Sequence, residues 1–296
     1  APIGGYTEYR DGRYNIYTPS HWPFHVRRTV ADVLGIAEAE IKVIQTNPSP
    51  AYGEKVVYPS ILSAMSALVC QATGKTARLL LAPKEAEEFT TRKAPVHVKS
   101  TSILNEAGSI IAHDIHMRFD VGAYPLFTKE LLRRAVITSG SYYQVPNLSI
   151  TAEAIRTSAP PMNIYRGLGV SQSLFATEVH FSRLAEFSQL NPGDWKKSHT
   201  KDKHIITGVH VPNMPLEKLV DTVIEQSDFY RKHSAYEQIR KRRNSVKASR
   251  RFLRGIGIAT GFAGNGFTDK PVSGGNWGIR ATLDKKDQLT IECGTM

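Results

Sequence analysis

Two long runs of alternating residues, 94–104 and 109–119, constrain this chain more than any other feature. The tetrad Asn105-Glu106-Ala107-Gly108 separates them and favours a hairpin turn. Successive side chains of a strand point to opposite faces, so one face of the second run is predicted to be buried and the other exposed to solvent. The buried set predicted by this alternation is Ile111, His113, Ile115, Met117 and Phe119.

The chain before this hairpin predicts a mixture of strands and helices. Asp11-Gly12 is a tight-turn signal between two β-rich runs, and Pro23 opens a helix that stops near Gly35, before a strand over 40–45. Strand, helix and strand in this order indicate an α/β arrangement. A second helix is predicted over 57–73, closed by Gly74, with an apolar face of Ile61, Leu62, Met65, Leu68 and Val69.

Further elements follow the hairpin. We expect Thr128 to cap a helix over 129–138, and a strand over 148–156. Residues 191–195 are predicted to form a turn, 216–243 one or two helices, and 255–260 another strand. A last strand pair is predicted over 278–283 and 289–293.

The stretch 163–172 is where an irregular, glycine-punctuated loop turns into an amphipathic helix that we expect to start at Gln172. A helix start carries unpaired backbone N–H groups and the positive end of the helix dipole. Glycines let a ligand approach the backbone closely. Arg166-Gly167-Leu168-Gly169 before a helix therefore suits an anionic or oxo-bearing ligand.

Composition and charge narrow the class of protein. An apolar share of 41% with 22% charged residues is that of a soluble globular chain, and its first residue, Ala1, suggests a processed or excised protein. Cys70 and Cys293 lack the paired spacing of a metal site, which favours free thiols in a reducing cytoplasm.

The net charge of +11 is concentrated in one basic cluster. The cluster offers no zinc-finger spacing and no aromatic platform, so we expect a solvated face or a contact for an acidic partner subunit, and no nucleic acid. Its members are Arg240, Lys241, Arg242, Arg243, Lys247, Arg250, Arg251 and Arg254.

In this order the motifs resemble the molybdopterin-binding large subunit of the xanthine dehydrogenase and aldehyde oxidase family. The resemblance spans almost the whole chain. The matching segments are the Asp11-Gly12 hairpin with Tyr17-Thr18, residues 51–55, 120–124, 143–147, 166–169 with Gln172, 175–178 running to 190–192, and the final 292–296.

The resemblance implies an α+β, mixed α/β fold: a two-lobed molybdenum-cofactor-binding domain, incomplete here. We expect residues 1–160 to form the first lobe and 161–296 the loop-to-helix connection and part of the second. It implies molybdopterin, alternatively as its cytosine dinucleotide, holding molybdenum with no direct protein ligand. The implied reaction hydroxylates an aldehyde or nitrogen heterocycle with oxygen from water. Iron–sulfur clusters and FAD on partner subunits carry the electrons away, in an oligomer without membrane contact.

The resemblance also assigns residues. Tyr52 and Gly53 match the loop that faces the metal, and Arg166 and Gly167 match the loop whose backbone lies at the pterin. Leu168 stands where the family often stacks a phenylalanine on the substrate, and Arg134 aligns with an arginine that orients purines. We therefore expect the bends around Tyr52 and Arg166 to come together in space and line one cleft.

Three residues differ from the family's motif and leave a second function possible. Ala51 and Glu54 replace two glycines, and Val56 stands where purine enzymes have a glutamate. The family's catalytic base, a glutamate far toward the C-terminus, is absent, so no catalytic residue is assigned to this chain and we expect it to be inactive alone. The alternative is a degenerate relative that serves as a non-catalytic scaffold or binding module.

Overall fold

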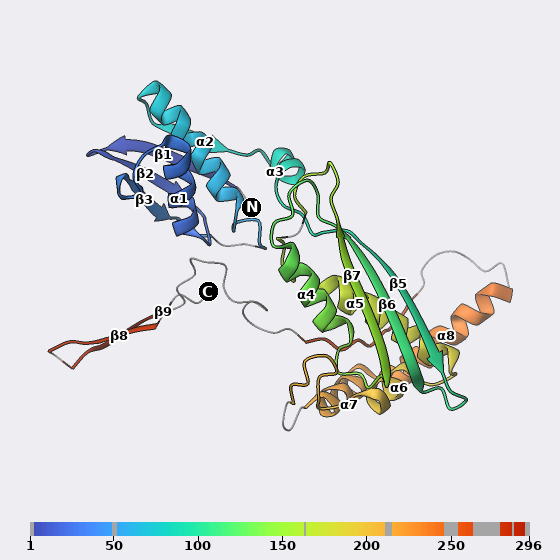
Figure 1. The fold of residues 1–296 in the computed structure, drawn as a ribbon. Helices are drawn as coiled ribbons and strands as arrows, with labels where there is room; N and C mark the ends of the chain where they lie inside the picture. The colour runs from blue at the N-terminus through green and yellow to red at the C-terminus, as the bar shows by residue number, and fades with distance from the viewer. Residues whose placement is uncertain are drawn as a thin grey trace. The chain divides into compact units, whose positions relative to one another are not determined.

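The structure is a computed structural model that describes residues 3–48, 52–162, 164–210, 215–245, 254–262, 279–285 and 287–293. Its contacts divide the chain into two compact units, Ala1–Ala263 and Gly264–Met296. Figure 1 shows the elements of both units in chain order. Everything that positions the candidate site lies in the first unit.

The first sheet contains the predicted Asp11-Gly12 hairpin. Strands β1 (Gly4–Arg10) and β2 (Arg13–Thr18) pair antiparallel, β3 (Ile41–Gln45) pairs parallel to β2, and β4 (Ala77–Leu80) pairs antiparallel to β1. The strand order is therefore β3-β2-β1-β4. Helix α1 (Pro23–Leu34) ends at Gly35, whose φ of 67° is left-handed, as predicted. Two short helices, η1 (Glu38–Glu40) and α3 (Pro83–Phe89), complete this part.

Helix α2 (Tyr58–Thr73) has the predicted extent, but of its five predicted core residues only Leu62 is buried. Ile61, Met65, Leu68 and Val69 are each between 43% and 53% exposed. The helix instead packs through small residues, and the Ser66 hydroxyl lies 2.7 Å from that of Thr7 on β1. Small side chains bring a helix close to a strand, and the larger apolar side chains are left on the outer face.

The second sheet has the order β5-β6-β7, with β5 (Val96–Leu104) antiparallel and β7 (Asn147–Ile155) parallel to β6 (Ile110–Asp120). Helix α4 (Thr128–Ser139) links β6 to β7, and its Leu131 and Ala135 pack on Met117 and Phe119. Thr128 is not the cap, because the helix begins at Thr128 and Phe127 holds the capping position with a φ of 53°.

The predicted alternation along β6 holds from His113 to Phe119 and fails at the turn end. Ile111 is 42% exposed whereas Ile110 is buried. The register shifts between Ile103 and Leu104, which pair with Ala112 and Ile110 respectively. Such a bulge adds a residue to one strand and exchanges the faces of the residues beyond it.

The rest of the first unit is mainly helical. Helix α5 (Val170–Phe187) starts two residues before the predicted Gln172, and the predicted turn at 191–195 is the start of α6 (Pro192–His199), capped by Asn191. The predicted 216–243 region forms two helices, α7 (Leu216–Ser227) and α8 (Phe229–Ser245). The strand predicted at 255–260 was wrong, because residues 254–262 are irregular. In the second unit β8 (Ile279–Leu283) pairs with β9 (Leu289–Cys293) as predicted.

Candidate functional site

The bends around Tyr52 and Arg166 meet directly, as predicted, and the cleft that they were expected to line stays a prediction. The Arg166 amide donates a hydrogen bond of 2.6 Å to the Tyr52 carbonyl. The Tyr52 and Tyr165 rings stack with centroids 6.5 Å apart, and the Arg166 guanidinium lies 5.7 Å from the Tyr52 ring centroid. We call Tyr52, Gly53, Tyr165 and Arg166 the loop junction.

Gly53 is what lets the two bends approach so closely. Its φ is 104°, and a Cβ at this position would lie 2.9 Å from Tyr165 Cα and 3.0 Å from the Ile164 carbonyl oxygen. Only a residue without a side chain satisfies both the backbone angle and the contact. Any other residue would push the Arg166 bend away from the Tyr52 bend.

The carboxylate of Glu54, which stands where the family has a glycine, bonds back onto the backbone of the Tyr52 bend. Glu54 is 8% exposed, and its Oε2 accepts a 2.7 Å hydrogen bond from the Tyr52 amide. Lys55 is buried beside it, and its Nζ donates to the Pro48 carbonyl at 3.0 Å. The side chains of Glu54 and Lys55 therefore brace the Tyr52 bend from behind. Burial lowers the pKa of the neighbouring His21, an effect that Glu54 partly opposes.

The start of α5 combines glycine backbone with a cation, and three of its amides donate within the chain: Arg166 to the Tyr52 carbonyl, Leu168 to the Tyr165 carbonyl and Val170 to the Gly167 carbonyl. Arg166 and Gly167 are exposed, and Gly167 has a φ of 89°. Gly169 precedes the helix with a φ of 86°, and a Cβ there would lie 2.5 Å from the Leu131 carbonyl oxygen. The backbone amides at the helix start and the Arg166 cation thus lie in one short segment.

Two predicted substrate residues, Arg134 and Leu168, contact other parts of this chain. Arg134 Nε donates to Glu130 Oε1 at 2.6 Å, one turn earlier on α4, and its side chain is 22% exposed. Leu168 is half-buried against the cluster that contains Leu131 and Ala135. The contacts between the bends are thus made by Tyr52, Gly53, Tyr165 and Arg166. Arg134 and Leu168 instead make their contacts at α4.

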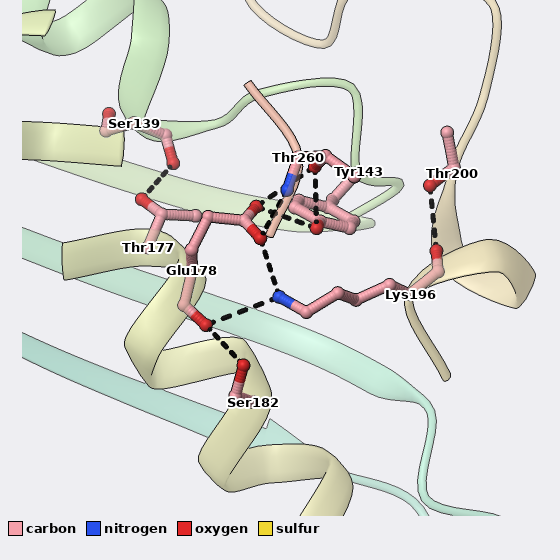
Figure 2. A network of polar contacts seen from close by, with 8 residues as sticks. All are labelled: Ser139, Tyr143, Thr177, Glu178, Ser182, Lys196, Thr200 and Thr260. Atoms are coloured by element: carbon pink, nitrogen blue, oxygen red, sulfur yellow. Dashed lines mark hydrogen bonds and ion pairs between the residues drawn. The ribbon is translucent and has the colours of Figure 1, made fainter. Parts of the chain in front are cut away.

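Sequence reasoning missed a buried polar network around Glu178, in the middle of α5, which Figure 2 shows in close-up. The Glu178 carboxylate on α5 accepts hydrogen bonds from Lys196 Nζ and Tyr143 Oη, each at 2.7 Å, and from the Thr260 amide at 2.9 Å. All three side chains of Tyr143, Glu178 and Lys196 are almost fully buried. We call Tyr143, Glu178, Lys196 and Thr260 the buried junction.

Burial shifts the titration of this network. It lowers the pKa of Lys196, and the Glu178 carboxylate opposes that shift. It raises the pKa of Tyr143, and Glu178 raises it further. The signal available in the sequence was weak, because Lys196 is adjacent to Lys197 on α6 and only the fold shows which lysine faces Glu178.

The basic cluster is only partly within the described residues. Arg240 pairs with Glu237 on its own helix at 2.6 Å and lies 3.7 Å from Glu186 on α5. Lys247, Arg250 and Arg251 lie outside the described residues, as do the predicted motif positions Ala51 and Asn163. Among the described residues, no helix is long and apolar enough to cross a membrane.

Comparison with known proteins defines the family. The family model for the molybdopterin cofactor-binding domain matches residues 2–198, which is more than half of the chain, so this chain belongs to that family. Aldehyde oxidase 3 of Mus musculus is 25% identical over 236 residues, covering 79% of this chain and 18% of the mouse protein. The nicotinate dehydrogenase large molybdopterin subunit of Eubacterium barkeri is 23% identical over 232 residues, covering 76% of this chain and 54% of that subunit.

A solved structure has the same fold. The aldehyde oxidoreductase of Desulfovibrio gigas superposes with a TM-score of 0.71 at 18% identity, covering 98% of this chain and 30% of that one. The fold is therefore the mixed α/β fold of that aldehyde oxidoreductase, as the resemblance implied. The chain spans about a fifth of the mouse relative and about half of the bacterial subunit.

The residues present fit a molybdopterin. Its phosphate and the oxygen ligands of its metal are anionic, and the loop junction offers an exposed arginine beside glycine backbone at a helix start. The one acidic side chain within the Tyr52 bend, Glu54, is turned back onto the Tyr52 amide. Glu54 is 8% exposed, so Arg166 is the exposed charge of the loop junction.

Proposed function

We propose that this chain is the part of a molybdenum hydroxylase large subunit that holds molybdopterin at the loop junction. The observation that carries the proposal is the 2.6 Å bond between the Arg166 amide and the Tyr52 carbonyl, which joins the two bends that the family resemblance assigns to the cofactor. Tyr52 and Gly53 would face the metal's ligands, and Arg166 and Gly167 would bind the pterin.

The activity of the whole subunit follows as part of the proposal. When bound, molybdopterin supplies a metal that can hydroxylate an aldehyde or a nitrogen heterocycle with oxygen from water. Arg134 and Leu168 would contact the substrate, and the general base would come from outside residues 1–296. Iron–sulfur and flavin partners would accept the electrons, and the cofactor's nucleotide form belongs to the same proposal. The compartment would be the cytoplasm, where the buried free thiol of Cys70 stays reduced.

Cofactor retention tests the proposal. The chain is expressed in a host that synthesises molybdopterin, and bound molybdenum and oxidised pterin are measured by mass spectrometry and fluorescence. Arg166→Ala and Gly167→Val should each lower bound pterin at least tenfold, because they remove the cation and block the backbone. Arg13→Ala, an exposed arginine on β2, is the matched control. Equal retention in Arg166→Ala and Arg13→Ala would contradict the proposed site.

The scaffold alternative draws on one specific observation. Arg134, a predicted substrate residue, is bonded to Glu130, and Leu168 packs on the α4 core. A chain whose substrate residues serve internal packing could keep the fold without the chemistry. A wild-type chain that carries no pterin from such a host, while keeping the circular dichroism of a folded protein, would favour this alternative.

A further inference from the structure

A groove of about 890 Å³ runs between β5 and α5, from Ser171 and Gln172 in the first turn of α5 to Arg183 further along the helix. Val96, Val98 and Ser100 line its strand side, and Phe175 and Val179 line its helix side. Phe175 is 71% exposed, which is unusual for a large apolar side chain on a helix that packs against a sheet. The helix thus presents an apolar face beside the edge of the sheet, where no described element covers it.

The strand at this edge has unused backbone hydrogen-bonding capacity. Among the described strands β5 pairs only with β6. The Asp120 amide donates to the Pro95 carbonyl, so in an antiparallel pair the alternate residues beginning with Val96 direct their N–H and C=O groups to the free edge. Val98 and Ser100 are two of them, and both also line the groove. A long, unprotected edge strand is a template for pairing with another strand.

The charge of the groove selects the partner. Lys93 and Arg183 contribute two cations, and none of the lining residues is acidic. Lys93 Nζ donates to Ser171 Oγ at 2.7 Å, and within the described part of the chain Arg183 has no ion-pair partner. A second copy of this chain is disfavoured, because each copy has a net charge of +11.

We propose that this groove binds an acidic, extended segment of a separate polypeptide, which adds a strand to the β5 edge. Its alternate apolar side chains would pack on Phe175 and Val179, and its carboxylates would meet Lys93 and Arg183. The proposal goes beyond cofactor binding, because Phe175 and Arg183 lie outside both bends of the loop junction.

Peptide binding tests the proposal in the full chain. The probe is a fluorescein-labelled decapeptide of alternating valine and glutamate, and fluorescence anisotropy gives its Kd. Phe175→Ala and Arg183→Ala should each raise the Kd about tenfold, and Ser100→Pro should do the same by removing one edge-facing N–H from an edge strand that tolerates proline. Phe24→Ala is the matched control, because Phe24 on α1 is 66% exposed and outside the groove.

Hydrogen exchange gives a second readout that a merely electrostatic contact would not move. Bound peptide should slow exchange of the Val98 and Ser100 amides. Equal binding of a peptide of the same composition with blocked rather than alternating order would overturn the proposal. Complete displacement by inorganic phosphate would indicate a small-anion site, and concentration-dependent self-association lost in Phe175→Ala would indicate a second copy; either result would also overturn it.

Discussion

The loop junction and the buried junction both tie together segments that are far apart in the sequence, but by opposite means. Tyr52 and Arg166 are joined through backbone, with Gly53 providing the space and with Arg166 left exposed. Glu178 and Lys196 are joined through buried charges whose hydrogen bonds are satisfied within the chain. The loop junction therefore leaves the Arg166 side chain exposed to a ligand, whereas the buried junction fixes Glu178 of α5 against Lys196 of α6.

The largest expected effect is in the buried junction. Glu178→Gln should lower the free energy of unfolding by about 3–5 kcal/mol, because it leaves the Lys196 ammonium buried without a counter-charge. Urea denaturation measures this. The control is Glu186→Gln on the same helix. Glu186 forms an exposed ion pair with Arg240 at 3.7 Å, so its loss should lower the free energy of unfolding by less than about 1 kcal/mol. Equal losses in both variants would show that the buried junction is not stabilising.

The pH dependence of stability should come from the same buried region. His113 is 2% exposed and packs on Phe181, and burial, with a smaller effect of the neighbouring His180, lowers its pKa to about 4. The unfolded chain binds a proton near pH 6.5 and the folded chain does not, so stability is fully present above pH 6.5. It should fall by roughly 3 kcal/mol as the pH drops to about 4.

Chemical denaturation at a series of pH values checks this, using His113→Gln, which should flatten the profile in that window. The exposed His97 on β5 supplies the control, since His97→Gln should leave the slope unchanged. A wild-type profile that is flat between pH 6.5 and 4 would mean that His113 is not held neutral.

At the loop junction, Gly53→Ala should lower the free energy of unfolding by roughly 2 kcal/mol. The substitution adds a Cβ 2.9 Å from Tyr165 Cα at a φ of 104°. Gly12→Ala separates the effect of the backbone angle from that of the close contact. Gly12 also has a positive φ, but a Cβ there would meet nothing within 4 Å. The loss measured for Gly53→Ala by urea denaturation should exceed that for Gly12→Ala. Similar losses would assign the effect to backbone angle alone.

The smallest expected effect sharpens the contrast. Arg166→Ala should change the free energy of unfolding by only about 0.5–1 kcal/mol, the usual contribution of an exposed cation over an aromatic ring. The same substitution is expected to lose the cofactor. A loss of stability as large as that of Glu178→Gln would show that Arg166 is a packing residue rather than a binding residue.

The sequence by itself determined most elements, the family and the two loops. Local patterns were sufficient for this: Gly35 and Gly74 end their helices, Asp11-Gly12 makes the hairpin, and the family model matches residues 2–198. The residue roles at Arg134 and Leu168, and the lobe boundary at 160, stay predictions.

Tertiary structure alone decided which faces are buried. Periodicity assigned Ile61 and Met65 to the core, yet α2 packs through Ser66 because small residues allow a closer approach to β1. A bulge opposite Ile103 exchanged the faces of Ile110 and Ile111, and no local signal marks it. The choice of Lys196 over Lys197 as the partner of Glu178 depends on how α6 lies against α5, which is a property of long-range packing and not of sequence spacing.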